Sequence, residues 1–531
     1  MGIYLNPGNK GFQESVCSEI YVDKTGLIEY TNKYLNTKQK HICVSRPRRF
    51  GKSMALEMLS AYYSRGCDSR EMFHGLKIEA APKFGEHLNM YDVIYLNMQQ
   101  FLIRAKQREI TEYLEEEVLE EVREEYGEFL KRQDIGLADA LRRIYAKTER
   151  TFIFLIDEWD CVMRERQDFE EMQKQYLDFL RDLLKDQPYV ALAYMTGILP
   201  IKKYGVHSAL NMFTEYSMVD QDVFEEYTGF TEAEVKALCS RYHMNFEDVS
   251  SWYDGYELIN FQHVYNPKSV VEAVRRGRCS NYWTATETYE ALKKYINMNL
   301  DGLRDEIVKM LGRESVPVRT VKFKNDMRNL QTKDDVLTLL IHLGYLAYDS
   351  VEERAFIPNN EIMGEFENAI SDGGSENLIK VIMDSERLLQ NTLNGRESEV
   401  AAALDRAHTE IASNLNYNDE FALGCAVILA YWSARKDYKI IRELPVGYGY
   451  ADIVFLPLPG RNKPAIVVEL KYNKAAQTAI QQIKDKKYAD VLRGYSGEVI
   501  LVGINYDKDR KDAGHSCRIE RMECSGSDDV L

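Results

Sequence analysis

Residues 45–53, with the sequence Ser-Arg-Pro-Arg-Arg-Phe-Gly-Lys-Ser, constrain the fold of this chain more than any other feature. They follow a short apolar run at 41–44 and precede a segment, 54–62, whose apolar residues have helical spacing. A strand, a tight loop and a helix in this order are the context of a phosphate-binding loop. The loop amides and the helix N-terminus concentrate partial positive charge there. The pattern predicts that Lys52 contacts the β- and γ-phosphates of a nucleotide and that Ser53 ligates Mg²⁺.

This loop departs from the usual G-x-x-x-x-G-K-[ST] pattern, because Arg46 replaces the first glycine and Pro47 has no backbone N–H. The alternative is a basic helix start that merely contains Gly-Lys-Ser. The loop by itself leaves both interpretations open. Nucleotide binding would assign the cofactor contacts to Arg46, Pro47, Arg48, Arg49, Phe50, Gly51, Lys52 and Ser53.

A second feature, the apolar run 151–156 followed by Asp157 and Glu158, favours nucleotide binding. Such a run is typical of a buried central strand in a parallel sheet. Asp157 at its carboxyl end would hold Mg²⁺, and Glu158 would polarise the attacking water as a catalytic residue. Thr196, which ends the next strand (190–195), is predicted to sense the γ-phosphate. The structural alternatives are a strand that runs into an acidic helix cap and a threonine that caps a strand.

The alternation of predicted strands and helices up to residue 197 indicates an α/β fold with a parallel sheet. The segment from Ile110 to Leu130 has apolar residues every four positions and predicts an amphipathic helix. Thr231 and Glu234 form a capping box at the start of a later helix. The aromatic segments that follow predict a packed lid, although Asp254 within them could instead face the nucleotide.

Length and composition limit the remaining interpretations. The chain of 531 residues is too long for one ordinary core, so two or three domains are expected. Apolar residues make up 45% and charged residues 29%, as in soluble globular proteins, and no apolar run is long enough to span a bilayer. Nine scattered cysteines without a Cys-x-x-Cys pair favour a cytoplasmic protein with reduced thiols. A net charge of −16 argues against coating nucleic acid over the whole surface but allows a local basic groove.

A second α/β unit begins near residue 418 and contains another group of polar residues on predicted strands. Glu469 and Lys471 are two apart on one strand, so both side chains project from the same face, and Asp452 lies on the neighbouring strand. Two carboxylates and an ammonium suit metal-assisted hydrolysis of phosphodiesters, with Asp452 and Glu469 binding Mg²⁺ or Mn²⁺. Lys471 would position the water or neutralise the transition state. Gln482 and Tyr488 come from the following helix, and charges on an edge strand are the structural alternative.

This combination of motifs resembles bacterial proteins that join an AAA-ATPase-like domain to a PD-(D/E)xK nuclease-superfamily domain. The resemblance spans about residues 15–510 and rests on segments 21–25, 45–53, 156–158, 196–198, 229–231, 252–256, 265–267 and 344–346, on Asp452, and on 469–471 and 482–483. It implies an AAA-like P-loop ATPase domain with a helical lid (1–285), a mainly helical connector (286–400), a restriction-endonuclease-like α/β domain (401–515) and a C-terminal tail (516–531). Arg46 is then this family's own form of the loop.

Two positions depart from the resemblance: Asp419 stands where a supporting glutamate is usual, and Ala451 replaces the proline before Asp452. The resulting hypothesis is an ATP-hydrolysing protein whose ATPase domain regulates a metal-dependent nuclease acting on nucleic acid, with DNA as the expected substrate. The alternatives are an ATP-driven switch whose nuclease-like domain only binds, and an ATPase that remodels a protein partner. A homo-oligomer is expected by analogy with AAA-type ATPases.

Overall fold

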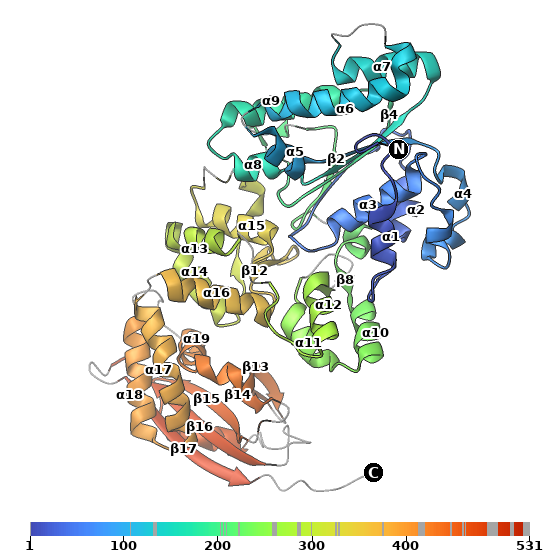
Figure 1. Cartoon of the computed structure of the whole chain (residues 1–531). Helices are drawn as coiled ribbons and strands as arrows, with labels where there is room; N and C mark the ends of the chain where they lie inside the picture. The colour runs from blue at the N-terminus through green and yellow to red at the C-terminus, as the bar shows by residue number, and fades with distance from the viewer. Residues whose placement is uncertain are drawn as a thin grey trace. The chain divides into compact units, whose positions relative to one another are not determined.

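The computed structural model of the chain (Figure 1) contains two compact units, each with its own sheet. Unit 1 is Met1–Tyr289 with Ser315–Glu365, and unit 2 is Glu290–Glu314 with Phe366–Leu531. The described residues are 2–106, 108–130, 135–201, 203–204, 207–208, 210–220, 223–256, 263–283, 288–298, 300–323, 327, 330–373, 376–411, 420–446, 449–458, 461, 463–485, 497–509 and 514–523. The stretch expected to be one helical connector is therefore shared: 315–365 belong to unit 1, whereas 290–314 and 366–400 belong to unit 2.

A five-stranded parallel sheet organises unit 1 and confirms the predicted fold class. The strand order is β2-β3-β4-β1-β7, so β1 with its phosphate loop lies next to β4 inside the sheet. The strands are β1 (His41–Ser45), β2 (Asp92–Asn97), β3 (Phe152–Asp157), β4 (Val190–Gly197) and β7 (Thr214–Tyr216), and a separate hairpin joins β5 (Lys203–Tyr204) to β6 (His207–Ser208).

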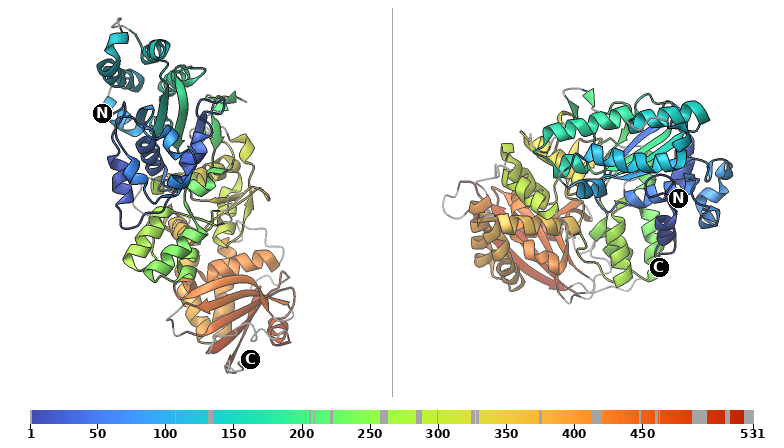
Figure 2. Two further views of the ribbon diagram at one scale, coloured as in Figure 1. Left: turned by 90° about the vertical axis from the view of Figure 1, so that its right-hand side faces the viewer. Right: turned by 45° about the horizontal axis from the view of Figure 1, so that its top comes forward.

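Helices cover both faces of this sheet (Figures 1 and 2), because successive side chains of its buried strands point to opposite sides. Phe154 and Ile156 of β3 pack with the second group of helices, while Ile153 and Leu155 pack with the first. The first group is α1 (Lys10–Val16), α2 (Gly26–Asn32), α3 (Lys52–Tyr63) and α4 (Phe84–His87). The second is α5 (Met98–Ala105), α6 (Ile110–Tyr126), α7 (Leu137–Thr148), α8 (Cys161–Glu165) and α9 (Glu170–Leu184).

Helix α6 confirms the predicted apolar stripe. Ile110, Leu114, Val118, Val122 and Tyr126 are all buried in the core, and the helix ends at Tyr126, one turn before the predicted end. The intervening glutamates lie on the other side, as expected for a helix that packs one face on a sheet.

A helical lid follows the sheet, with its own small core. It consists of β8 (Phe230–Thr231), α10 (Glu232–Tyr242), α11 (Phe246–Tyr253), β9 (Val264–Tyr265) and α12 (Pro267–Arg276). The predicted capping box is present: the Thr231 hydroxyl accepts a hydrogen bond from the Glu234 backbone N–H, and the Glu234 carboxylate accepts one from Thr231 N–H.

The last part of unit 1 packs against the phosphate loop, which is why it groups with the ATPase-like sheet. Gly344 has a φ of 87° at the end of α15 (Lys333–Leu343), and an added Cβ would meet the Pro47 ring at 2.7 Å. The Tyr256 hydroxyl donates to Gly344 O at 2.7 Å. The remaining strands are β10 (Val316–Pro317), β11 (Ala347–Asp349) and β12 (Arg354–Phe356).

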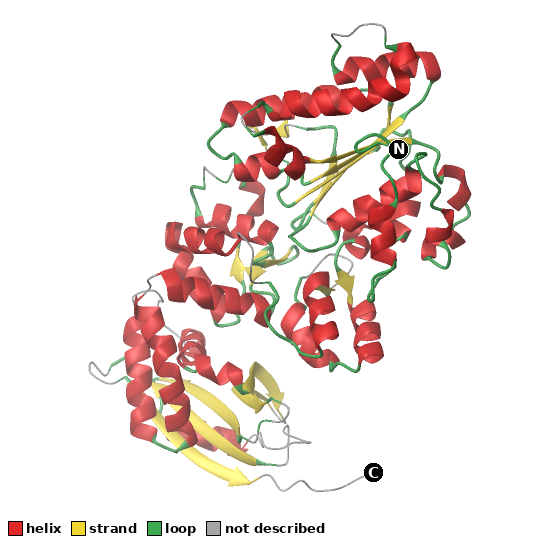
Figure 3. Cartoon of the chain, in the orientation of Figure 1, coloured by secondary structure: helices red, strands yellow, loops and turns green. Residues whose placement is uncertain are grey.

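Unit 2 is built on a sheet whose strands are among the yellow arrows of Figure 3. Its order is β13-β14-β15-β16-β17, with β15 and β16 parallel and the other described neighbours antiparallel. Its strands are β13 (Tyr438–Val446), β14 (Gly449–Pro457), β15 (Ala465–Tyr472), β16 (Glu498–Tyr506) and β17 (His515–Glu523). Its helices are α14 (Leu303–Leu311), α17 (Glu376–Leu393), α18 (Glu397–Ile411), α19 (Glu420–Ala430) and α20 (Ala476–Asp485), while α13 (Thr288–Met298) and α16 (Asn360–Gly373) contain the division points. β17 occupies part of the expected C-terminal tail, because its residues pair along the whole of β16.

In the part of the chain that the structure describes, no helix is both long and apolar enough to cross a membrane.

Candidate ATPase and nuclease sites

The phosphate loop adopts an anion-binding conformation. Gly51 has a φ of 85°, which a residue without Cβ adopts at little cost, and it is followed directly by α3. Arg49 is also left-handed, with a φ of 69°. Gly51, the N-cap residue of α3, has no side chain that could cover the first amide groups of the helix. An N-terminus of this kind favours phosphate.

Lys52 is held inside the loop. Its side chain is 5% exposed, and its ammonium group donates to the backbone carbonyl oxygens of Arg46 at 2.9 Å and Pro47 at 2.8 Å. Burial lowers the pKa of Lys52, and the carboxylates of Glu158 and Asp157 oppose that shift. The ammonium group is therefore positioned at the loop by two neutral acceptors.

The start of α3 and the ends of β3 and β4 bring Ser53, Asp157 and Thr196 together. Ser53 Oγ donates to Asp157 Oδ2 at 2.7 Å, and Thr196 Oγ1 donates to Asp157 Oδ1 at 2.7 Å. Asp157 is fully buried, so both oxygens of its carboxylate are fixed by these hydroxyls. A hydroxyl and a carboxylate in contact beside a phosphate loop fit the ligand set expected for Mg²⁺ with nucleotide. Thr196 acts on this carboxylate, and its predicted contact with a γ-phosphate stays a prediction.

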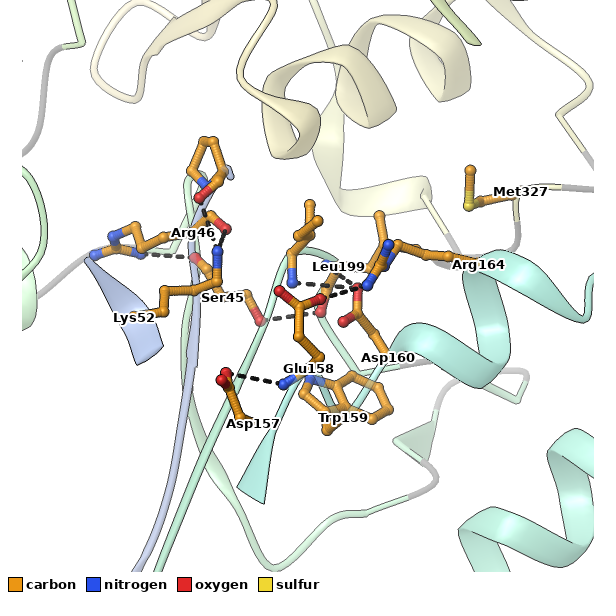
Figure 4. A network of polar contacts seen from close by, with 12 residues as sticks. Ser45, Arg46, Lys52, Asp157, Glu158, Trp159, Asp160, Arg164, Leu199 and Met327 are labelled. Atoms are coloured by element: carbon orange, nitrogen blue, oxygen red, sulfur yellow. Dashed lines mark hydrogen bonds and ion pairs between the residues drawn. The ribbon is translucent and has the colours of Figure 1, made fainter. Parts of the chain in front are cut away.

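Glu158 is constrained by its backbone and by an ion pair (Figure 4). Its φ is 52°, and its carboxylate accepts a hydrogen bond from Arg164 at 2.5 Å. Burial raises the pKa of Glu158, and nearby Asp160 raises it further, while Lys52 and Arg164 lower it. The side chain remains 24% exposed and borders the cavity described below.

Asp160 and Arg164 are site residues that sequence reasoning missed. Asp160 is fully buried and accepts hydrogen bonds from Leu199 N–H at 2.8 Å and from Arg164 Nε at 3.0 Å. Arg164 thus bridges Asp160 and Glu158, as Figure 4 shows. The available signal was the spacing of four between an acid and an arginine directly after the Asp-Glu pair, which places the two on one side of a helical turn.

The predicted contacts from the rest of the loop divide into two kinds. The Arg46 guanidinium is buried away from the loop and donates to Thr228 Oγ1 at 3.1 Å, so this side chain anchors the strand end. Arg49 donates to Tyr282 O at 2.6 Å, and Phe50 is buried edge-to-face against Tyr256. Arg48, Arg49 and Phe50 also line the cavity, whereas Pro47 packs on Gly344. Their roles toward a nucleotide stay predictions.

A cavity of about 650 Å³ opens at the loop and is large enough for a nucleotide. Its walls are the loop, Glu158, the segment before α2 and the lid, with Tyr21, Tyr227 and Phe230 supplying aromatic surface. Lys24 joins these walls through an ion pair of 2.6 Å with Glu234 on α10. The segment 21–25 therefore builds one wall.

Asp254 lies elsewhere. Its carboxylate contacts His263 Nδ1 at 2.7 Å, its backbone oxygen accepts from the Asn359 amide, and it is absent from the cavity wall. Its predicted alternative, facing the nucleotide, has no support in this geometry.

The second group of residues lies on β14, β15 and α20 of unit 2. Glu469 and Lys471 project from the same face of β15, as predicted, and Lys471 Nζ lies 3.0 Å from Glu469 Oε1. Gln482 of α20 donates to the same carboxylate oxygen. Both strand residues are buried, so the pair is screened from bulk water.

Asp452 lies where β14 and β15 part. The described pairing of the two strands ends at Ile453 and Val468, and the Asp452 carboxylate then accepts a hydrogen bond from Leu470 N–H at 2.6 Å. Asp452 is thereby held beside the residue between Glu469 and Lys471. Asp419 and Tyr488, predicted to support this site, lie outside the described residues.

The described residues contain no group of three or more histidine, cysteine, aspartate or glutamate side chains placed to hold a metal ion. A cation at either site would therefore combine the carboxylates of that site with other oxygen ligands, such as hydroxyl groups, water and phosphate oxygens. Two carboxylates, Asp452 and Glu469, fit such an arrangement in unit 2, as Ser53 and Asp157 do in unit 1.

Comparisons with known proteins agree with this division. Residues 12–207 match the family described as Predicted AAA-ATPase, and residues 425–515 match the PD-(D/E)XK nuclease superfamily. A protein of Azotobacter chroococcum mcd 1, described as an uncharacterized protein in the vnfD 5′ region, is 23% identical over 525 residues, which cover 92% of this chain and 93% of that protein.

Two solved structures share a distant likeness. The Walker-type ATPase paby2304 of Pyrococcus abyssi is 13% identical, with a TM-score of 0.34, over 65% of this chain and 94% of its own. The ORC2 protein of Aeropyrum pernix, solved as ADPNP and ADP complexes, is 10% identical, with a TM-score of 0.24, over 68% and 98%. Likeness at this level establishes neither a ligand nor an activity.

The two matched ranges contain the phosphate-loop site of unit 1 and the Asp452, Glu469 and Lys471 site of unit 2, respectively. The chain therefore joins a predicted AAA-ATPase domain to a PD-(D/E)XK nuclease-superfamily domain, the architecture that its motifs predict.

Proposed function

We propose that unit 1 binds and hydrolyses ATP. The observation that carries this proposal is the Ser53–Asp157 contact of 2.7 Å, next to the Lys52 loop and beside a cavity of nucleotide size. The loop amides and Lys52 would hold the β- and γ-phosphates, and Ser53 and Asp157 would hold Mg²⁺, which neutralises phosphate charge when bound.

Hydrolysis requires a base for one water molecule, and we assign that role to Glu158, which borders the cavity. Its carboxylate accepts the proton of the water as the water oxygen bonds to the γ-phosphorus. The bond from that phosphorus to the bridging oxygen of ADP breaks, which yields ADP and phosphate. Thr196 orients Asp157 during this step through its hydroxyl.

We further propose that unit 2 hydrolyses phosphodiester bonds of DNA and that ATP at unit 1 regulates it. The support is the convergence of Lys471 and Gln482 on Glu469, with Asp452 held at the strand opening beside them. Asp452 and Glu469 would hold Mg²⁺ or Mn²⁺, which activates water and stabilises phosphate charge. Lys471 would stabilise the negative charge that develops as water adds to phosphorus and one P–O ester bond breaks.

Two wider assignments belong to the same proposal. We place the protein in the cytoplasm, where its described cysteines, all free thiols, would stay reduced. We also propose that the protein forms a homo-oligomer, by analogy with AAA-type ATPases.

The test is cleavage of plasmid and linear DNA with Mg²⁺ or Mn²⁺, with and without ATP. Asp452→Ala and Glu469→Gln should abolish cleavage, and Lys52→Ala should abolish both ATP hydrolysis and the effect of ATP on cleavage. One matched control is Glu498→Gln, an acid at the other end of neighbouring β16 that pairs with Arg521. The other is Lys33→Ala, an exposed lysine at the C-cap of α2. Both controls should behave as the wild type.

ATP hydrolysis without cleavage of any DNA would refute the nuclease assignment for DNA. RNA is then the next substrate, and a binding switch becomes the better interpretation.

A further inference from the structure

A second cavity, of about 320 Å³, lies beside the nucleotide cavity, and both are lined by Ser53. Its walls include Glu57 and Ser60 of α3, Asn97 at the end of β2, and Asp157. The two cavities therefore meet where Ser53 contacts Asp157, which is the position proposed for the cation. Apart from Ser53 and Asp157, the residues that line the second cavity were not predicted from the motifs.

Glu57 is one helical turn after Ser53, so the two side chains lie on the same side of α3. Its carboxylate is half-buried and makes no hydrogen bond or ion pair within the described part of the chain. Burial raises the pKa of Glu57, and the negative charge of Asp157 raises it further. Glu57 and Asp157 repel each other, and Glu57 has no cationic partner of its own among the described residues, so a cation between the two carboxylates would be favoured.

Ser60 gives an independent indication that the cavity holds polar ligands. The side chain is 3% exposed, lines the cavity one turn beyond Glu57, and its hydroxyl has no partner among the described residues. An unpartnered buried hydroxyl is destabilising, and a bound water molecule that hydrogen-bonds to it removes this cost. The cavity has room for several waters.

We propose that Glu57 is a positioning residue for the Mg²⁺ of bound ATP. Its carboxylate accepts hydrogen bonds from water molecules of the Mg²⁺ coordination shell, and these waters occupy the second cavity. Mg²⁺ characteristically keeps several waters in its coordination shell, and these waters can donate hydrogen bonds to a carboxylate that does not touch the ion. This inference rests on the proposed ATP site and adds a residue to it.

The test is binding of a fluorescent, non-hydrolysable ATP analogue to the full chain, titrated with Mg²⁺. Glu57→Gln should leave affinity in EDTA unchanged or improved, because a negative charge near the phosphates is lost. The Mg²⁺ concentration at half-saturation should rise roughly tenfold, as for other groups that hold a metal through its bound waters. Glu57→Asp keeps the charge on a shorter side chain, so its Mg²⁺ concentration at half-saturation should lie between those of the wild type and Glu57→Gln.

Glu14→Gln is the matched control, because Glu14 is an exposed acid that also contributes negative charge near Glu57. It should change half-saturation by less than twofold. A second readout is water proton relaxation with Mn²⁺ and the analogue, which should show altered bound water in Glu57→Gln. An unchanged Mg²⁺ requirement in both Glu57 variants, with normal analogue binding, overturns the role of Glu57. A wild-type chain that binds no analogue overturns the ATP site itself.

Discussion

Replacing Arg164 by methionine tests the ion-pair network behind the ATPase site. Arg164 is 8% exposed and lies between two carboxylates, at 2.5 Å from Glu158 and 3.0 Å from Asp160. Methionine preserves much of the volume but removes the charge and the hydrogen bonds. Asp160, which is fully buried, would then keep only backbone donors.

The expected cost follows from the burial of these groups. Removing one partner of a buried ion pair costs about 3–5 kcal/mol, since an uncompensated charge remains. Glu158 is 24% exposed and can regain water, so the lower end, about 3 kcal/mol, is expected. Asp160→Asn keeps an oxygen acceptor but removes the buried charge. In the double variant the two losses should overlap, with a coupling energy of about 2 kcal/mol.

The assay is urea unfolding followed by tryptophan fluorescence. Trp159, Trp252 and Trp283 belong to unit 1 and Trp432 to unit 2, so a Trp432→Phe background reports unit 1. Costs that simply add, or a loss below about 1 kcal/mol in Arg164→Met, would refute the idea that Arg164 neutralises a buried acid pair.

Two further predictions concern pH. Arg164 lowers the pKa of Glu158, so Arg164→Met should move the acid limb of the ATPase pH profile to higher pH. An acid limb that stays at the same pH would contradict the assignment of Glu158 as the catalytic base. Glu361 is 1% exposed, and burial raises its pKa to about 7, so the folded state binds more protons than the unfolded state between about pH 4.5 and 7. Stability of unit 1 should therefore fall by roughly 3 kcal/mol across that window, and Glu361→Gln should flatten the fall in urea midpoints; equal slopes in both proteins would exclude Glu361 as the cause.

The sequence was most informative where structure is set by neighbours along the chain. The strand, loop and helix around Lys52, the buried run before Asp157 and the capping box of Thr231 with Glu234 all form as predicted. Each depends on local backbone preference and on a regular apolar pattern, which a single segment carries by itself. The two-residue spacing of Glu469 and Lys471 likewise required only the pleat of a strand.

Contacts between distant segments were not predictable in this way. The Arg46 guanidinium bonds to Thr228, which is 182 positions away, so its inward direction depends on where the lid begins. The pairing of β17 with β16 similarly decides that residues 515–523 are a strand. Local composition there resembles a polar tail, and only the exposed edge of β16 supplies the missing backbone partners.

The sequence by itself determined the two kinds of domain, their order and the acids and lysines that identify each site, because motif spacing reflects local geometry. Only the tertiary structure decided which neighbouring groups shift the pKa values of those residues and hold their side chains in place. Arg164 is brought to Glu158 by a turn after β3, and Glu57 faces Asp157 because α3 packs across the strand that carries it. Such partners depend on the relative placement of whole elements, which burial of both sheet faces fixes in three dimensions.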